Sequence, residues 1–229
     1  AGGYMTWRRL VKQALYDTPV PHPLVLLDGN TGTAKTAILA RLASRGVQVI
    51  DLEGLAGHRG SLLGATPGGQ PDQKAFETTL AVALANLDPS KPVVVEAESS
   101  KIGHINLPPQ LWMAMQTAPR IMITAPIAAR SAFLETAYAD VISNPENLSK
   151  QLKLLISIRG HAVVNGWLSL LEAGEFRALA AALMEQHYDA AYDKSRGGDA
   201  REVIANLDAQ TLDDAGQEML ADAIIQVLK

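Results

Sequence analysis

The chain has 229 residues, of which 48% are hydrophobic and 19% are charged, a globular composition with room for one large domain or two small ones. It contains no cysteine, which excludes a disulfide scaffold, a zinc finger, an iron–sulfur cluster and a thiol nucleophile within these residues. With 20 basic and 24 acidic side chains, its net charge of -4 excludes attachment to nucleic acid by overall charge, so such binding requires local patches.

The sequence shows neither a membrane segment nor an export signal. No apolar run reaches the roughly 18 residues that a transmembrane helix needs. The opening AGGYMTWRRL lacks the apolar core of a signal peptide. We therefore expect a cytoplasmic protein without membrane contact. Because the chain starts at Ala1 and not at Met, we also expect a processed product or a fragment of a longer chain.

The predicted elements alternate between helices and short apolar strands. Residues 1–20 form a linker whose amphipathic pattern predicts a helix within 4–17, ended by the prolines of PVPHP. The remaining chain, 21–229, is expected to be one domain. Its predicted strands are 24–28, 47–51, 92–96, 120–124 and 203–207. Its predicted helices are 35–45, 72–87 and 211–227. Between them, 52–72 is expected to be a Gly-rich loop of a length that is usually functional or disordered.

This order of elements predicts an α/β fold of the P-loop NTPase type. Strands that alternate with helices favour a mainly parallel sheet with helices on both faces. Residues 126–190 look helical almost throughout and are too long for a single crossover. We interpret them as a helical insertion or subdomain.

The strongest local motif is a phosphate-binding loop, Gly29-Asn30-Thr31-Gly32-Thr33-Ala34-Lys35-Thr36. It follows a predicted strand and opens a predicted helix, so backbone N–H groups and the helix dipole can surround a phosphate. Lys35 is expected to reach phosphate oxygens, and the Thr36 hydroxyl to ligate Mg²⁺. Ala34 replaces the second glycine of the motif, which weakens binding only if phosphate leaves no room for a Cβ. A glycine-rich turn with a surface lysine is the alternative.

Carboxylates follow two of the predicted strands. Glu96 ends the run Val93-Val94-Val95 and takes the place of the acid that orients Mg²⁺ in P-loop sites, so Thr36 and Glu96 are the expected metal ligands. Glu98 points the same way if the strand continues that far. Glu53 lies after the second strand, where a solvated loop charge is an equally good interpretation.

Basic groups in the loops are weaker candidates. His58 and Arg59 lie among glycines on the side where α/β sheets bind ligands, and both could contact a phosphate or cap their own loop. Lys101 and Arg130 lie near predicted strand ends, where charges are more often solvated. Tyr188 and Tyr192 can share one helical face four residues apart, and packing explains them.

Several strings resemble the P-loop domain of the bacterial tRNA 2-selenouridine synthase family. They are QVIDLEGLAGHRGSLLG (48–64), QPDQKAFE (70–77), LDPSKPVVVEAESSKIGHINLP (87–108) and HYDAAYDKS (187–195). The loop at 31–36 lies where that family carries its Walker-type motif. In the family, an N-terminal rhodanese-like domain with a catalytic cysteine precedes the P-loop domain. Neither that domain nor any cysteine is present here, so we expect the rhodanese domain to be separate or removed.

The resemblance implies a tRNA-modifying transferase. The family acts on 2-thiouridine at the wobble position of tRNA, uses geranyl diphosphate to form an S-geranyl intermediate, and then uses selenophosphate to introduce selenium. It implies Mg²⁺ and a small-molecule diphosphate (geranyl diphosphate or a nucleotide) as ligands, and tRNA as partner. Carried over by position, the resemblance implies that Lys35, Glu96, His58 and Arg59 are catalytic and that Gly29–Thr36 bind phosphate, and it makes Glu98, Ser99 and Lys101 further candidates. Arg130 is a further candidate only from its place near a predicted strand end.

Two other interpretations stay open. A nucleotide-dependent switch would hydrolyse ATP or GTP slowly and use residues 52–72 as its moving loop. A small-molecule kinase would use residues 126–190 as a lid, with Arg130 or Arg159 closing over the transferred phosphoryl group.

Overall fold

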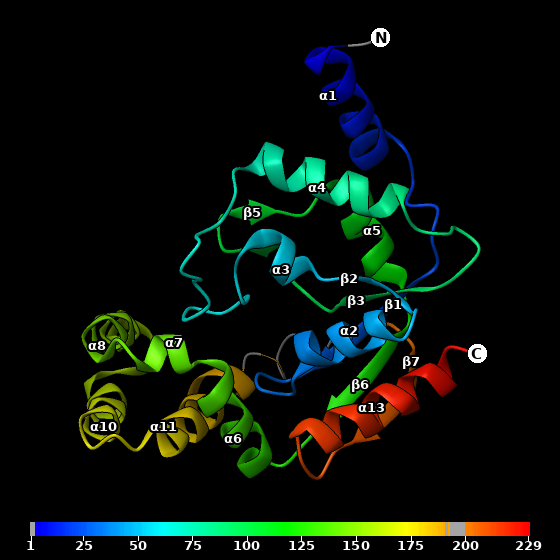
Figure 1. Ribbon diagram of the computed structural model, residues 1–229. Coiled ribbons are helices and arrows are strands. Elements are labelled where there is room, and N and C mark those ends of the chain that lie inside the picture. The colour runs from blue at the N-terminus through cyan, green and yellow to red at the C-terminus, as the bar shows by residue number, and fades with distance from the viewer. Residues whose placement is uncertain (1–2, 191, 193–199) are drawn as a thin grey trace.

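A computed structural model describes residues 3–190, 192 and 200–229 of the chain (Figure 1). Its centre is a five-stranded sheet in the order β2-β3-β1-β6-β7, and every neighbouring pair is parallel. The strands are β1 (Leu24–Gly29), β2 (Gln48–Ile50), β3 (Val93–Glu96), β6 (Arg120–Thr124) and β7 (Val203–Asp208). All five predicted strands are therefore confirmed, as is the α/β fold.

Helices cover both faces of this sheet. On one face α2 (Lys35–Ser44) and α13 (Asp214–Val227) pack through a cluster that includes Ile38, Leu39 and Ile224. On the other face lie α3 (Leu52–Ala56), α4 (Gln73–Ala85) and α5 (Pro109–Thr117), with Phe76 and Leu80 fully buried. Because the central strands are buried on both faces, their sequences read as continuous apolar runs.

The N-terminal segment is attached to the body of the protein. Its helix α1 (Tyr4–Lys12) continues into the π-helical turn η1 (Gln13–Asp17), and Leu15 is fully buried. Glu77 of α4 accepts hydrogen bonds from Arg8 and from Tyr16, each at 2.7 Å. Burial and the bond to Glu77 raise the pKa of Tyr16 to about 12. A buried carboxylate thus holds the segment against α4.

The second half of the chain contains a group of helices beside the sheet, visible at the lower left of Figure 1. They are α6 (Ile127–Ala137), α7 (Ala139–Ile142), α8 (Pro145–Lys153), α9 (Ile156–Arg159), α10 (His161–Glu172), α11 (Phe176–Leu183) and the π-helical turn η2 (Met184–Tyr188). They have their own core, centred on Trp167, Leu152 and Val164. None of the helices in the described ranges is long and apolar enough to cross a membrane.

One prediction about local structure was wrong in part, and one element was not predicted. The expected loop 52–72 begins with the helix α3, which starts because Asp51 caps it by accepting from the Gly54 N–H at 2.6 Å. Residues 101–106 form a hairpin of two-residue strands, β4 (Lys101–Ile102) and β5 (Ile105–Asn106), which the sequence analysis did not predict. Strands of two residues are too short for an alternating pattern to be recognised.

Candidate functional site

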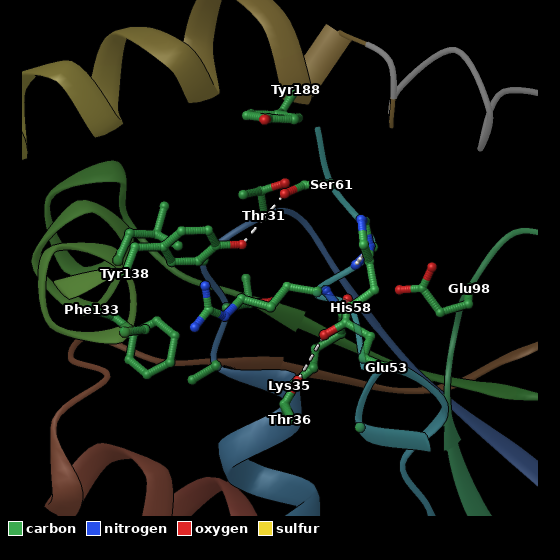
Figure 2. A pocket seen from close by; sticks show the side chains of 18 of the residues that line it. Thr31, Lys35, Thr36, Glu53, His58, Ser61, Glu98, Phe133, Tyr138 and Tyr188 are labelled. Atoms are coloured by element: carbon green, nitrogen blue, oxygen red, sulfur yellow. Dashed lines mark hydrogen bonds between the residues drawn. The ribbon is translucent and has the colours of Figure 1, made fainter. Parts of the chain in front are cut away.

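A cavity of about 500 Å³ lies at the carboxyl edge of the sheet. Its walls come from the phosphate loop, from the segment 53–66 and from α6, together with Glu98, Tyr138, Tyr188 and Tyr192. Figure 2 shows Lys35 and Thr36 on one side of this cavity, Glu53, His58 and Glu98 along a second, and Phe133, Tyr138 and Tyr188 facing them. Ligands of open α/β sheets bind at this edge, because the loops that follow parallel strands meet there.

The phosphate loop joins β1 to α2 and presents Thr31 to Thr36 to the cavity. Lys35 donates from Nζ to the Gly29 carbonyl at 2.8 Å, so its ammonium lies across the loop. Burial works to lower the pKa of Lys35, but the nearby Tyr192, Glu98, Glu53 and Asp28 outweigh it and the pKa is raised. The lysine is therefore a cation held at the cavity floor.

Ala34 is the one non-glycine residue with a positive φ among the described residues, at 60°. Left-handed backbone costs a residue with a Cβ about 1–2 kcal/mol. The methyl group is 4% exposed and packs in the core cluster of α2, which offsets about 0.8 kcal/mol, and alanine also loses less chain entropy than glycine on folding. Burial of the methyl group thus offsets part of the strain that the left-handed backbone imposes on alanine here.

Three carboxylates gather beside the loop. The Thr36 hydroxyl lies 3.0 Å from Glu96 Oε1 and 3.1 Å from Glu53 Oε2, and the Glu53 N–H donates to Glu96 Oε2 at 3.2 Å. Glu96 is fully buried, and burial together with the charges of Glu53 and Asp51 raises its pKa well above the usual range. Glu98 lines the cavity and is hydrogen-bonded to the Glu53 side chain.

The crowding of these acids is suited to a divalent cation. Within residues 3–190, 192 and 200–229, no group of three or more His, Asp or Glu side chains is placed to hold a metal alone. A magnesium ion in a phosphate site needs fewer protein ligands, because phosphate oxygens and water complete its octahedron. The hydroxyl of Thr36 and the carboxylates of Glu96 and Glu53 are oxygen donors of the right kind, and their mutual repulsion is what a cation would relieve.

The same crowding predicts a pH effect on stability. Burial and the charge of Glu98 raise the pKa of Glu53 from 4.5 to about 7. A carboxyl group with a higher pKa in the folded chain binds its proton more tightly there, so the free energy of unfolding falls as pH rises from about 4.5 to about 7. At pH 8 we expect the free energy of unfolding of Glu53→Gln to exceed that of the parent by on the order of 1–3 kcal/mol. At pH 4.5 the two free energies should differ little.

Urea unfolding at the two pH values measures this difference. Glu202→Gln, which removes an exposed carboxylate next to β7, is the matched control and is expected to change little at either pH. Equal stability of Glu53→Gln and the parent at pH 8 would contradict the expectation.

His58 and Arg59 form one wall of the cavity. Arg59 donates to both oxygens of Asp140 at 3.0 Å, and its guanidinium lies 4.8 Å from the ring centre of Tyr138. The Nη1 atom of Arg59 is buried without a hydrogen-bond partner in the described structure, which leaves a donor available. His58 accepts from the Gly60 N–H at 3.2 Å, and burial followed by the nearby His104 lowers its pKa. The pair thus supplies a fixed cation and an imidazole that favours its neutral form.

A smaller apolar cavity of about 60 Å³ adjoins the first one. The two cavities share Thr31, Ser61, Leu134, Tyr138 and Tyr188 as walls. Beyond these, the apolar cavity is lined mainly by aliphatic side chains of the helical group, among them Leu148, Leu179 and Leu183. A polar cavity beside the Lys35 loop and an apolar recess therefore adjoin through a common wall.

The other sequence-predicted residues take different places. Ser99 and Lys101 are exposed, and the Ser99 hydroxyl donates to the Lys101 carbonyl at 2.6 Å in a surface turn, away from the cavity. Arg130 is 6% exposed and contacts the phosphate loop from behind, and Arg159 is bound to His187. Ser195, in the string 187–195, lies outside the described residues.

The aromatic residues that line the cavity were not predicted. Phe133 and Tyr138 on and after α6 lie about a hundred positions from the loop, and no local spacing connects them to it. Tyr188 was explained by packing alone. The spacing within HYDAAYDKS is the sequence signal for this wall, because Tyr188 and Tyr192, four residues apart, both line the cavity.

Comparison with known proteins gives one family. Residues 22–154, more than half of the chain, match the family model described as the tRNA 2-selenouridine synthase AAA domain. A protein named tRNA 2-selenouridine synthase from Alcanivorax borkumensis is 40% identical over 131 residues, which are 56% of this chain and 35% of that protein. Proteins of the same name from Shewanella loihica and Pseudomonas syringae pv. tomato are each 37% identical, over 60% and 62% of this chain.

The match covers only part of these relatives. It spans 36% of the Shewanella protein and 38% of the Pseudomonas protein, so this chain corresponds to about a third of the length of the relatives it matches. The matched range includes the phosphate loop, Glu53, Glu96 and the Arg59 wall. It ends just after α8, before α11 and η2, which supply Phe176, Leu179, Ala180, Leu183, Met184 and Tyr188 to the apolar cavity.

Proposed function

Because the chain belongs to the tRNA 2-selenouridine synthase AAA-domain family, we propose that it is the P-loop part of a transferase that modifies 2-thiouridine at the wobble position of tRNA. We further propose that its two joined cavities bind an isoprenoid diphosphate, geranyl diphosphate, and present it to the tRNA sulfur. The observation that carries this proposal is the shared wall between a phosphate site and an apolar recess. A nucleotide alone gives no reason for an aliphatic recess at that position.

The protein groups act by positioning and by stabilising charge. In the alkylation, the bond between C1 of the isoprenoid and the diphosphate oxygen breaks, the diphosphate leaves with the bonding electrons, and the tRNA sulfur forms a bond to C1. Lys35, the N–H groups of the loop and Arg59 lie where they can stabilise the leaving diphosphate. Mg²⁺, when bound, supplies further neutralisation of this charge, and Thr36, Glu96 and Glu53 are the residues placed to hold it.

The selenium step needs groups that these 229 residues do not contain. The family resemblance assigns it to selenophosphate and to a cysteine of a rhodanese domain, and this chain has no cysteine. The proposal for this chain is therefore limited to the diphosphate-dependent step.

A filling substitution in the apolar recess tests the proposal. Ala180 of α11 lines the recess but not the phosphate cavity, and Ala180→Phe places a ring where the tail is expected. We expect this variant to bind geranyl diphosphate about tenfold more weakly, because two fewer buried methylene groups remove about 1.6 kcal/mol. Its affinity for inorganic diphosphate should not change. Both affinities are measured by calorimetric titration in the presence of Mg²⁺.

The same titrations decide between the proposal and its alternatives. Equal loss of affinity for both ligands would mean that the ring disturbs the loop, and unchanged affinity for geranyl diphosphate would place the tail elsewhere. Tighter binding of ATP or GTP than of geranyl diphosphate would favour the nucleotide switch. For the kinase, the structure offers little support, since Arg130 and Arg159 are both engaged in other contacts and neither lines the cavity.

A further inference from the structure

Three segments far apart in the sequence meet at one carboxylate beside the phosphate loop. Asp189, which follows η2, accepts from Arg130 of α6 through both oxygens, with Nη1–Oδ1 at 2.9 Å and Nη2–Oδ2 at 2.7 Å. Asn30 of the loop donates from Nδ2 to Oδ1 at 3.0 Å. The side chains of Arg130 and Asp189 are 8% and 21% exposed. The loop, α6 and the end of the helical group are thus joined by charge-assisted hydrogen bonds.

Arg130 also sets the direction of a peptide group in the loop. Its Nη1 donates to the Thr31 carbonyl at 3.1 Å. The described chain has no cis peptide bond, so the N–H of Gly32, in the same peptide plane, points opposite to that carbonyl. Gly32 lines the cavity and Arg130 does not. The arginine therefore holds one carbonyl away from the anion site and turns one donor toward it.

The close contact of α6 with the loop supports this arrangement. Gly32 has φ +84°, and a Cβ there would lie 3.1 Å from Leu134 and 3.2 Å from the Cβ of Arg130. The loop consequently lies directly against the turn of α6 that carries the arginine. A change in the position of Arg130 therefore moves the Thr31–Gly32 peptide group.

Asp189 fixes the opposite wall as well. Tyr188 immediately precedes it, Tyr192 follows three residues later, and both rings line the cavity. The Lys35 ammonium lies 6.0 Å from the centre of the Tyr192 ring. The carboxylate that binds Arg130 and the loop therefore lies next to Tyr188 in the chain and three residues before Tyr192.

We propose that Asp189 is a positioning residue for anion binding: acting through Arg130, it aims the Gly32 N–H at the phosphate and holds the tyrosine wall in place. A buried ion pair can often be replaced by uncharged groups with little change in stability. If the Arg130–Asp189 pair served only the fold, its replacement would therefore leave ligand binding unchanged. The inference deepens the proposed function and rests on it only in that the loop binds a diphosphate.

Inorganic diphosphate with Mg²⁺ is the probe, and Asp189→Asn and the double variant Arg130→Gln/Asp189→Asn are the test proteins. The double variant leaves no unpaired charge, so it stays informative if the single variant unfolds. We expect both to bind the probe about tenfold more weakly than the parent, and the double variant to be no weaker than the single one, because the two residues act in series. Asp222→Asn, which breaks the ion pair between Asp222 of α13 and Arg45 at the end of α2, is the matched control.

Amide NMR separates positioning from a general loss of structure. In the parent, diphosphate should shift the Gly32 amide resonance, and in both variants this shift should shrink while the remote Gly46 resonance stays in place. Variants that bind within about twofold of the parent and retain the Gly32 shift, or losses that multiply in the double variant, would overturn the inference. A parent that binds inorganic diphosphate but not geranyl diphosphate refutes the proposed function alone. A parent that binds neither refutes both.

Discussion

Replacing Lys35 with alanine is expected to weaken the binding of inorganic diphosphate by about 10- to 100-fold, because a hydrogen bond to a charged group contributes about 1.5–3 kcal/mol. The Lys35 ammonium lies at the cavity floor, where it needs only to exchange the Gly29 carbonyl for a phosphate oxygen. The nearby Tyr192, Glu98, Glu53 and Asp28 raise its pKa against the effect of burial. No other residue of the loop carries a positive charge.

The variant is expected to stay folded. Lys35 is the first residue of α2, and alanine is a good helix former at that position. Glu53 and Glu98 lose a nearby cation, and protonation of one of them can compensate. Circular dichroism and urea unfolding check the fold, and calorimetric titration in Mg²⁺ checks the affinity.

Lys101→Ala is the matched control for this experiment. Lys101 lies on the exposed hairpin strand β4, and its side chain is not among those that line the cavity. We expect unchanged diphosphate affinity in this variant. If Lys35→Ala binds diphosphate as the parent does, the assignment of the phosphate loop is wrong, whatever the family.

Replacing Arg120 with methionine is expected to lower the free energy of unfolding by about 3–5 kcal/mol. Arg120 begins β6, and its Nη1 donates to Asp28 Oδ2 at 3.1 Å. The two residues are 6% and 5% exposed. Methionine removes the guanidinium and leaves the carboxylate in a site that water scarcely reaches. Since a domain of this kind has only about 5–15 kcal/mol of stability in total, this is a large fraction.

The position of the pair links this loss to the site. Asp28 directly precedes the loop, and its Oδ1 accepts from the Gly29 N–H at 2.6 Å. A carboxylate that moves or takes up a proton after losing Arg120 changes the start of the phosphate loop. We therefore expect weaker diphosphate binding to accompany the lower stability.

Urea unfolding compares this variant with Arg177→Met, which breaks the exposed pair Arg177–Glu135 and is expected to lose less than about 1 kcal/mol. In the double variant Arg120→Met/Asp28→Asn, much of the stability should return, because both members of the pair are then uncharged. A loss in Arg120→Met no greater than in Arg177→Met would show that the buried pair contributes little.

Local sequence was sufficient for the sheet and for the centre of the site. Strands buried on both faces appear as continuous apolar runs, and the motif that ends in Lys35-Thr36 follows one of them. Glu96 was recognised because it ends a run of three valines, and the structure brings its carboxylate within 3.0 Å of the Thr36 hydroxyl. These features depend on residues close together in the chain, which is why spacing alone predicts them.

The sequence by itself therefore determined the α/β architecture, the family and the loop that lines the cavity. Only the tertiary structure decided what surrounds that loop. The bond from Asp189 to Arg130 spans 59 positions, the contact of Arg59 with Asp140 spans 81, and the walls of the apolar recess come from helices packed across the cavity. Such contacts arise when separate elements bury their apolar faces together, and no local pattern records which side chains then meet.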